Sequence, residues 1–483
     1  MRLPERVSSA IPPPSGRKPR LNIAPRQIEG LLKKLEIYHQ GFGLCFRREE
    51  QRHWSLKYME GQMLDIERKS IEPMAQGVEG GNIQAMQQFI SDSLWSDEAL
   101  IRTHQGQVGK TLGQADGVLI LDGNDYPKQG DDSVGVARQY CGALGKVANC
   151  QASVVLCYAS QRGHTFLDRR LYLHETWFDP GFRDRWKRCG IPEETTFQTK
   201  PQLGWDMLVP VIAADEIPFQ WIAMDEGFGR DNHLLDNIDA YGKWFFAEIP
   251  CSTQVWRHRP KVVIPHAHSN IGRPPTKPRL SDDAPAPLRV DALANNLPAK
   301  RWHRFILHEG SKGPILADMA ALRVVMTEKG LPARQEWLVI RRAIGPEAEW
   351  KYYRSNAPAH TPLRTLAKMT AWRWPVESTI EECKGELGLD HYEVRGWAGW
   401  HHHTAMTMLS HHFLVSLRIH MGHDAPALTV SQVRRLLQVV LPRRPFDAQT
   451  ALNEIARIQR RNYAAYRSHR KRRLRELNAP PPN

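Results

Sequence analysis

The chain has 483 residues, enough for about two to four domains of ordinary size and for a substantial buried core. Lys and Arg total 66 against 52 Asp and Glu, which gives a formal net charge of +14. This balance favours a polyanionic partner such as nucleic acid over a cationic one, although a basic protein with another role has the same composition.

The seven cysteines are widely spaced and include no Cys-x-x-Cys pair, which argues against a zinc ribbon or a redox motif. Their odd number and spacing predict reduced intracellular thiols. The N-terminal residues lack the apolar segment of a secretion signal, and no apolar run approaches the roughly 18 residues that a membrane helix needs. We therefore expect a soluble, cytoplasmic protein without a membrane partner.

Residues 1–26 combine a run of three prolines with scattered basic residues and show no apolar periodicity, which predicts a disordered leader. Residues 27–112 follow a helical pattern instead. The clearest apolar stripe, with spacing i, i+3, i+4 and i+8, consists of Met86, Phe89, Ile90 and Leu94. We expect a small helical N-terminal domain over residues 27–112.

Residues 113–250 change to the pattern of strands. The apolar run Val118–Leu121 ends at Asp122, which predicts a buried strand with a carboxylate at its carboxyl end. Further strands are predicted over residues 152–158, 166–173, 221–224 and 244–249, and a short helix over residues 234–241. Strands that first form a meander and then alternate with helix are typical of a mixed α/β fold.

Residues 251–360 are rich in proline and contain alternating segments, at 337–341 and 350–353, that predict strands. They form either a β-rich inserted module or a long linker followed by hairpins. The pattern is helical again over residues 361–422, and a last helix over about 448–475 carries nine Arg and Lys residues. This dense charge suits a phosphate backbone, and a solvated helix face explains it nearly as well.

Two aspartates lie where the metal site of a phosphodiester-cleaving enzyme would be built. Such chemistry uses two divalent ions roughly 4 Å apart, and Mg²⁺ prefers a few carboxylate ligands on rigid elements. Asp122 closes one predicted strand and Asp225 closes another, so both are expected at the same edge of a sheet. Taken singly, a strand-end aspartate is more often a turn former or a helix cap.

A third acid lies on the helix predicted after Arg373. Glu377, Glu381 and Lys384 share one face of this helix, where a carboxylate can reach the metals and Lys384 can hold a phosphate. An amphipathic helix whose Glu and Lys residues pair with one another explains the pattern equally well. The adjoining apolar stripe, which would pack on the sheet, consists of Val376, Ile380, Cys383 and Leu387.

With these residues in place, the sequence resembles the DDE transposases of bacterial insertion sequences, in the branch with a β-rich insertion and a Y-R-E-K signature. The R-x₃-E-x₆-K part of the signature is met by Arg373, Glu377 and Lys384. The stretch beginning at Asp122, DGNDYPKQG followed by SVGVARQYCGALGKVANCQ, is similar to the first-acid region of one group of this family. The resemblance extends over about residues 30–420.

The resemblance implies a fold class and a domain organisation. We expect an α/β fold whose RNase H-like catalytic core has two parts, residues 113–250 and 361–422, interrupted by a β-rich insertion over 251–360. The helical N-terminal domain would bind DNA, and a basic helical region would occupy residues 423–483. About 150 residues separate Asp225 from Glu377, far more than a normal loop, which agrees with an inserted domain.

The resemblance also implies a function: a transposase that cuts DNA at the ends of its element and transfers the strands into target DNA. Asp122, Asp225 and Glu377 would be the catalytic residues and would bind two Mg²⁺ ions, with Mn²⁺ as a substitute. The enzyme would act as a homodimer on terminal inverted repeats and target DNA, in the nucleoid of a bacterial cytoplasm. The expected DNA contacts are Arg373, Lys384, Lys128 and Arg138.

Two positions depart from the family pattern. Thr370 stands where the signature tyrosine would lie, three residues before Arg373, which removes one expected phosphate contact. Many relatives have adjacent acids at the first strand end, whereas two residues separate Asp122 from Asp125 here. We assign the first acid to Asp122 because it ends the apolar run, with Asp125 as the substitute.

Two other functions stay open: a DNA-binding protein derived from such an enzyme that no longer cuts, and a metal-dependent nuclease that cuts without joining. Two further groups of residues also have open roles. Partial exposure on a helix is expected for His401, His402, His403, His411 and His412. Either a place in the core or stacking on an unpaired base is expected for Trp302, Trp337 and Trp350.

Overall fold

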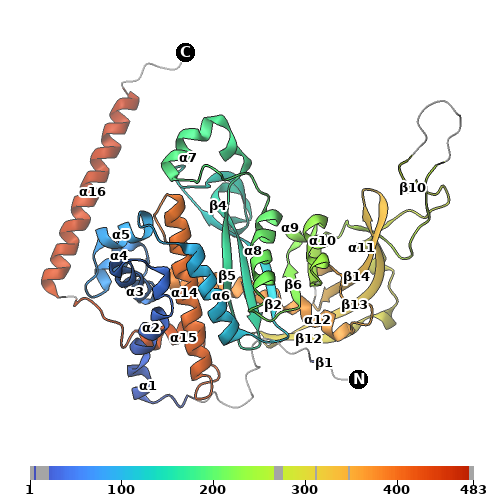
Figure 1. The fold of residues 1–483 in the computed structure, drawn as a ribbon, viewed down its shortest axis with the longest axis horizontal. Helices are drawn as coiled ribbons and strands as arrows, with labels where there is room; N and C mark the ends of the chain where they lie inside the picture. Colours follow the sequence, from blue (N-terminus) through green and yellow to red (C-terminus); the bar gives the residue numbers. More distant parts are fainter. Residues whose placement is uncertain are drawn as a thin grey trace.

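The computed structural model describes residues 5–6, 21–265, 276–310, 313–345, 349–445 and 447–477. Three parts follow one another along its long axis: a helical region, a central sheet with flanking helices, and a β-rich part (Figure 1). Most of the predicted leader, residues 1–26, lies outside the described residues. Its described residues include the short strand β1 (Glu5–Arg6), which pairs with residues 305 and 306.

The helical region packs around one long helix from the C-terminal half of the chain. This helix, α14 (Trp397–Met421), contacts α3, α5 and α6 and also strand β5 of the central sheet. One continuous hydrophobic core therefore joins the helical region to the sheet. The N-terminal helices are α1 (Pro25–Glu29), α2 (Leu31–Gln40), α3 (Glu49–Met63), α4 (Ile71–Gly77), α5 (Ile83–Ser91) and α6 (Asp97–Leu112).

The stripe predicted in this region is only partly correct. Met86, Phe89 and Ile90 are buried on α5, as the helical spacing predicts. Leu94 is 89% exposed, because α5 ends at Ser91 and the helical spacing no longer applies beyond that residue.

The central sheet is mixed, and the strands predicted for it are present. Three strands form an antiparallel meander, and two more are added parallel to the first of these. In space their order is β5-β4-β2-β6-β7, with the short β3 on β4. The strands are β2 (Val118–Pro127), β3 (Ala137–Cys141), β4 (Lys146–Ser160), β5 (Gly163–Tyr172), β6 (Trp221–Met224) and β7 (Trp244–Ile249).

Strand β2 is longer than the sequence predicted. The apolar run was expected to turn out of the sheet after Asp122, but the chain stays extended to Pro127. The reason is that residues 122–127 continue to pair with β4, from Asp122 with Val155 to Pro127 with Cys150. Only the parallel pairing with β6 stops at Leu121.

Different helices cover the two faces of the sheet. On α8, a Cβ at Gly204 would lie 3.2 Å from Leu121 Cδ1, so α8 packs on the face to which Leu121 points. On α13, Thr379 contacts the Cys157 sulfur at 3.5 Å. Leu121 pairs with the residue before Cys157, so these two side chains lie on opposite faces. Asp122, one residue after Leu121, therefore points to the face that α13 covers.

The remaining helices flank the sheet or connect its strands. The helices between β5 and β7 are η3 (Glu175–Phe178), η4 (Pro180–Phe182), α7 (Arg183–Cys189), α8 (Lys200–Ala214), α9 (Glu226–Gly229) and α10 (Asn232–Ala240). After the β-rich part come α12 (Leu363–Ala371) and α13 (Trp374–Leu387). α10 corresponds to the short helix predicted over residues 234–241.

The described residues of 251–355 consist mainly of strands and are called the β-rich part here, and its long strands extend the central sheet. β15 pairs with β7, and the sheet continues through β14 and β13 to β12. A second hydrophobic cluster lies here, under α11. The elements are β8 (Gln254–Trp256), β9 (Val262–Val263), β10 (Arg279–Leu280), β11 (Leu288–Arg289), α11 (Val290–Asn295), η5 (Ala299–Arg301), β12 (His303–Gly310), β13 (Gly313–Glu328), β14 (Leu331–Ala343) and β15 (Trp350–Ser355).

The C-terminal part contains α15 (Val430–Leu437) and the basic helix α16 (Ala448–Leu477). An ion pair between Arg457 and Glu72 ties α16 to α4. Beyond this contact α16 projects from the helical region (Figure 1). The seven cysteines are free thiols. None of the helices in the described ranges combines the length and apolarity that crossing a bilayer needs.

The five histidines for which partial exposure was expected, His401, His402, His403, His411 and His412, are instead buried on α14, which corrects that expectation. Every residue of α14 from Gly399 to Val415 is buried, so the polar residues in this stretch have no solvent-facing side. Their ring nitrogens bond within the protein instead: His403 with Tyr58, His412 with Thr111, and His411 with Glu382. Burial lowers the pKa of His403 to about 4.

Burial of neutral histidines predicts that the fold loses stability in mild acid. The pKa values of His104, His164 and His403 fall from 6.5 to about 4 because burial disfavours the charged ring. Between these pH values the unfolded chain takes up protons that the folded chain does not. Each such histidine then opposes folding by about 1.4 kcal/mol per pH unit. We therefore expect the midpoint temperature of thermal unfolding to decrease as the pH is lowered from about 7.5 to about 5.

Paired variants isolate this effect in scanning calorimetry. His104→Gln removes one buried ring and should make the dependence of the midpoint on pH shallower. His233→Gln, at an exposed position, should leave the dependence unchanged. An unfolding midpoint that does not change with pH in this range would contradict the prediction.

Candidate active site

Asp122 and Asp225 lie next to each other at one edge of the central sheet. β2 and β6 are parallel, and their last paired residues are Leu121 and Met224. Asp122 and Asp225 are the next residues on the two strands, so both leave the parallel pairing at the same level. Asp225 also caps α9, since its Oδ1 accepts a hydrogen bond from the Phe228 N–H at 3.2 Å.

The two aspartates concentrate negative charge in a poorly hydrated place. Burial raises the pKa of Asp122 to about 7, with a further contribution from the charge of Asp225, while Arg373 opposes the shift. Burial also raises the pKa of Asp225, against the stabilising N–H of Phe228. Glu377 repels Asp122 as well, which places a third carboxylate within electrostatic range.

Glu377 reaches this edge of the sheet from the first turn of α13. The helix begins after Arg373 and ends at Leu387, and the next residue, Gly388, forms a left-handed C-cap with a φ of 72°. Ile380 is only partly buried, and Thr379 faces the sheet in its place. The other three positions of the predicted apolar stripe are buried as predicted: Val376, Cys383 and Leu387. This packing fixes the rotation of α13 and hence the position of Glu377.

Arg373 lies between the acids. Its Nη1 donates to Asp122 Oδ2 at 3.0 Å, and its Nη2 donates to Glu377 Oε1 at 2.5 Å. Its Nε lies 3.9 Å from Glu248 Oε2. A single guanidinium thus contacts carboxylates from β2, α13 and β7, and it accounts for the convergence of Asp122 and Glu377.

Glu248 is a fourth carboxylate at this edge, and sequence reasoning missed it. It lies one residue before the end of β7, its side chain is 15% exposed, and Lys351 Nζ contacts its Oε1 at 3.1 Å. It also raises the pKa of Asp225, although burial has the larger effect. The signal was available, because Glu248 is an acid close to the end of a predicted strand, as Asp122 and Asp225 are.

The donor chemistry of this cluster fits a hard divalent cation. Four carboxylates face two positive side chains, Arg373 and Lys351, so negative charge is in excess. Carboxylate oxygens are the ligands that Mg²⁺ prefers. In their present positions, however, the described residues include no group of three or more His, Cys, Asp or Glu side chains arranged to hold an ion. The guanidinium of Arg373 occupies the space between the acids instead.

Asp125, the substitute for the first acid, points away from this cluster. It is three residues beyond Asp122 on an extended strand, so its side chain lies on the opposite face. There its Oδ2 accepts a hydrogen bond from the Gly142 N–H at 2.6 Å. Lys384, a predicted DNA contact on α13, donates to the backbone carbonyl of Asp125 at 3.1 Å.

The other two predicted DNA contacts lie outside the acid cluster. Lys128 Nζ is 3.7 Å from the centre of the Tyr392 ring, and burial lowers its pKa to about 8. Arg138 is exposed on β3. Thr370, at the position of the signature tyrosine, is buried and donates to the Ala367 carbonyl.

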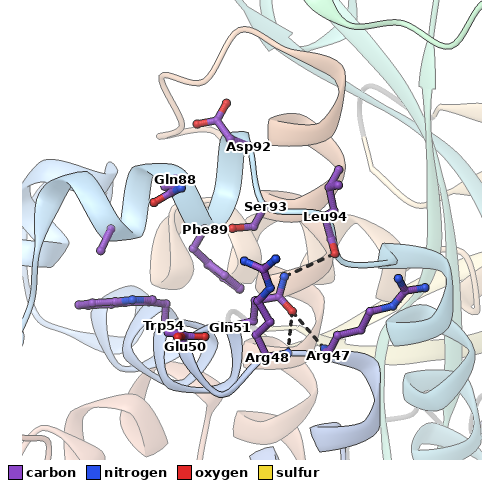
Figure 2. A pocket seen from close by; sticks show the side chains of 11 residues that line it. Arg47, Arg48, Glu50, Gln51, Trp54, Gln88, Phe89, Asp92, Ser93 and Leu94 are labelled. Atoms are coloured by element: carbon purple, nitrogen blue, oxygen red, sulfur yellow. Dashed lines mark hydrogen bonds between the residues drawn. The ribbon is translucent and has the colours of Figure 1, made fainter.

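A cavity of about 500 Å³ lies in the helical region, and none of the four carboxylates at the sheet edge lines it (Figure 2). Trp54, Phe89 and Leu94 supply apolar walls, and the arginines Arg47 and Arg48 flank it (Figure 2). The Gln51 side chain accepts a hydrogen bond from the Arg47 N–H and donates one to the Leu94 carbonyl. Because Glu50 and Asp92 also line the cavity, its charge does not select one class of ligand.

A second cavity, of about 420 Å³, has a strongly cationic lining in the β-rich part. Its lining includes Arg323, whose guanidinium carbon lies 5.3 Å from the centre of the Trp337 ring and which donates to the Gln335 carbonyl at 2.8 Å. No carboxylate lines it, and the other charged or titratable lining residues are Arg257, His258, Arg301 and His303. Trp302 and Trp350, by contrast, pack against each other and the second hydrophobic cluster.

Comparison with known proteins identifies the family of the chain. Residues 41–314, more than half of the chain, match the family described as DDE superfamily endonuclease. The matched segment includes Asp122 and Asp225 and ends before Glu377. A probable transposase for insertion sequence element IS701 of Microchaete diplosiphon is 28% identical over 376 residues, which cover 77% of this chain and 84% of the relative. The predicted resemblance is thereby confirmed, and the chain belongs to the DDE superfamily of endonucleases.

Proposed function

We propose that this protein is a transposase that cuts DNA at the ends of a mobile element and transfers the strands into target DNA. The observation that carries the proposal is the convergence of Asp122, Asp225 and Glu377, from two parallel strands and a helix, around Arg373. The membership in the DDE superfamily and the similarity to the probable IS701 transposase support it.

The three acids would hold two Mg²⁺ ions, with Mn²⁺ as a substitute. When bound, the ions would supply Lewis-acid activation of the attacking oxygen and neutralise charge on the leaving one. The protein holds the acids in place by rigid means: Asp122 by its pairing with β4, Asp225 by its cap on α9, and Glu377 by the packing of α13. Arg373 and Lys384 would donate to phosphate oxygens of the DNA and orient the scissile bond.

The same proposal interprets the architecture. The order β5-β4-β2-β6-β7, with acids after β2 and β6, serves as the RNase H-like catalytic core. The β-rich part between β7 and α12 is the insertion that precedes the last acid. A homodimer on paired terminal inverted repeats would complete the active assembly, and the cationic cavity and α16 offer positive surface to the DNA backbone.

Removing any one of the three acids should abolish cleavage without unfolding the protein. Asp122→Asn, Asp225→Asn and Glu377→Gln keep the shape of each side chain and remove its charge. We expect Mg²⁺-dependent cleavage of a DNA fragment that spans the flanks of the gene to fall by roughly 10³-fold or more, about 4 kcal/mol of transition-state stabilisation. Binding to the same fragment should change little, and EDTA should abolish cleavage by the unmodified protein.

Glu381→Gln is the matched control, because Glu381 lies on the same helix and is exposed. Its cleavage rate should equal that of the unmodified protein. Retained nicking in any of the three acid variants would refute the triad. Cleavage without joined products would instead indicate a nuclease, and binding without any cleavage would indicate a DNA-binding protein derived from a transposase.

The cationic cavity generates a separate prediction about DNA affinity. Each phosphate contact made by Arg or Lys releases counterions, so its loss lowers the dependence of the binding constant on salt. We expect the double variant Arg257→Glu/Arg301→Glu to weaken duplex binding and to reduce the slope of log K against log salt by about 2. Fluorescence anisotropy over a range of NaCl concentrations measures both quantities.

The control for this experiment is Arg395→Glu, an exposed residue paired with Asp132 outside the cavity. It also reverses a surface charge and should leave the slope near that of the unmodified protein. Equal slopes for the double variant and the control would show that the cavity does not contact DNA.

A further inference from the structure

In this structure Arg373 takes the place that a cation would occupy among the acids. Its guanidinium is engaged at Asp122 Oδ2, at Glu377 Oε1 and, more distantly, at Glu248 Oε2. These acids come from three elements that are far apart in the sequence. Within the described ranges, Arg373 alone forms ion pairs with both Asp122 and Glu377.

A guanidinium and a divalent ion compete for this position. The Asp122 and Glu377 oxygens that accept the N–H groups of Arg373 are no longer free to face a metal. An ion that binds here must first separate Arg373 from at least one of its carboxylates.

The position of Arg373 in the chain allows its side chain to leave without unfolding a helix. It lies between α12, which ends at Ala371, and α13, which begins at Trp374. Trp372, buried at 2% exposure, anchors the backbone of this junction. The Arg373 side chain itself is 23% exposed, so rotation about its own bonds can carry the guanidinium towards solvent.

A DNA phosphate is the group best suited to draw Arg373 away. The planar fork of a guanidinium binds phosphate with two parallel hydrogen bonds, as it binds carboxylate. Resting on the proposed function, we propose that Arg373 is a positioning residue that closes the acid site in the free protein. A backbone phosphate of bound DNA takes up its guanidinium and opens the site to divalent metal.

This arrangement makes DNA binding and metal binding cooperative. Metal displaces Arg373 from the acids and so leaves it available for a phosphate, while DNA displaces it from the same acids and so favours metal. Such coupling is reciprocal and typically amounts to 5- to 150-fold in affinity, or about 1 to 3 kcal/mol. The free protein therefore holds few metal ions, and the site fills when substrate is present.

Mn²⁺ binding to the full-length protein tests the proposal without any measurement of activity. Free Mn²⁺ is followed by electron paramagnetic resonance, with and without a duplex of about 30 base pairs. The proteins are the unmodified chain, Arg373→Gln, Asp122→Asn as the blank for ions bound by DNA or by other sites, and Arg395→Gln. The last removes one positive charge from an exposed ion pair outside the site.

We expect Arg373→Gln without DNA to bind Mn²⁺ about tenfold more tightly than the unmodified protein, and Arg395→Gln to match the unmodified protein. Adding duplex should tighten binding to the unmodified protein about tenfold and change Arg373→Gln less than twofold. The comparison within the unmodified protein needs no variant, so it holds even if Arg373→Gln folds poorly.

Two results would overturn the inference: equal or weaker Mn²⁺ binding by Arg373→Gln without DNA, or no tightening of the unmodified protein when duplex is added. Failure of the proposed function has a different signature. In that case Asp122→Asn would bind as much Mn²⁺ as the unmodified protein, because the acids would not be the metal site at all.

Discussion

The structure depends on holding four carboxylates together at one edge of a sheet. Like charges in a poorly hydrated place repel one another, and the pKa of Asp122 near 7 expresses that repulsion together with the effect of burial. Rigid backbone elements hold the carboxylates in place against this repulsion. The register of β2 and β6 fixes the two aspartates, and the packing of the buried side of α13 fixes Glu377. Arg373 supplies the counter-charge, so one residue between two helices stabilises the centre of the molecule.

The sequence predicted the parts of this site that depend on local pattern. Asp122 and Asp225 each follow an unbroken apolar run, and such runs indicate buried strands without any knowledge of their partners. Glu377 was located by the helical spacing of its neighbours together with a family signature. The parallel register that puts the two aspartates side by side is a long-range property, and the sequence pattern does not contain it.

The parts that were missed depend on contacts between distant segments. Glu248 lies inside a strand run, one residue before its end, so the search for a residue that closes a strand passed over it. The burial of the five α14 histidines between His401 and His412 was missed because polar residues on a helix usually face solvent, whereas this helix is buried on every side from Gly399 to Val415. Leu94 was placed on a helix that ends three residues earlier, since helix ends are poorly marked in sequence.

The attachment of the β-rich part to the core has an evolutionary and practical consequence. The chain leaves the core at the end of β7 and re-enters it through β15, and Ile249 pairs directly with Tyr352. The entry and exit points are therefore hydrogen-bonded neighbours, whatever length of chain lies between them. Segments whose ends are already adjacent can be lengthened, shortened or exchanged with little strain on the scaffold. The β-rich part is thus free to diversify while the carboxylates keep their geometry.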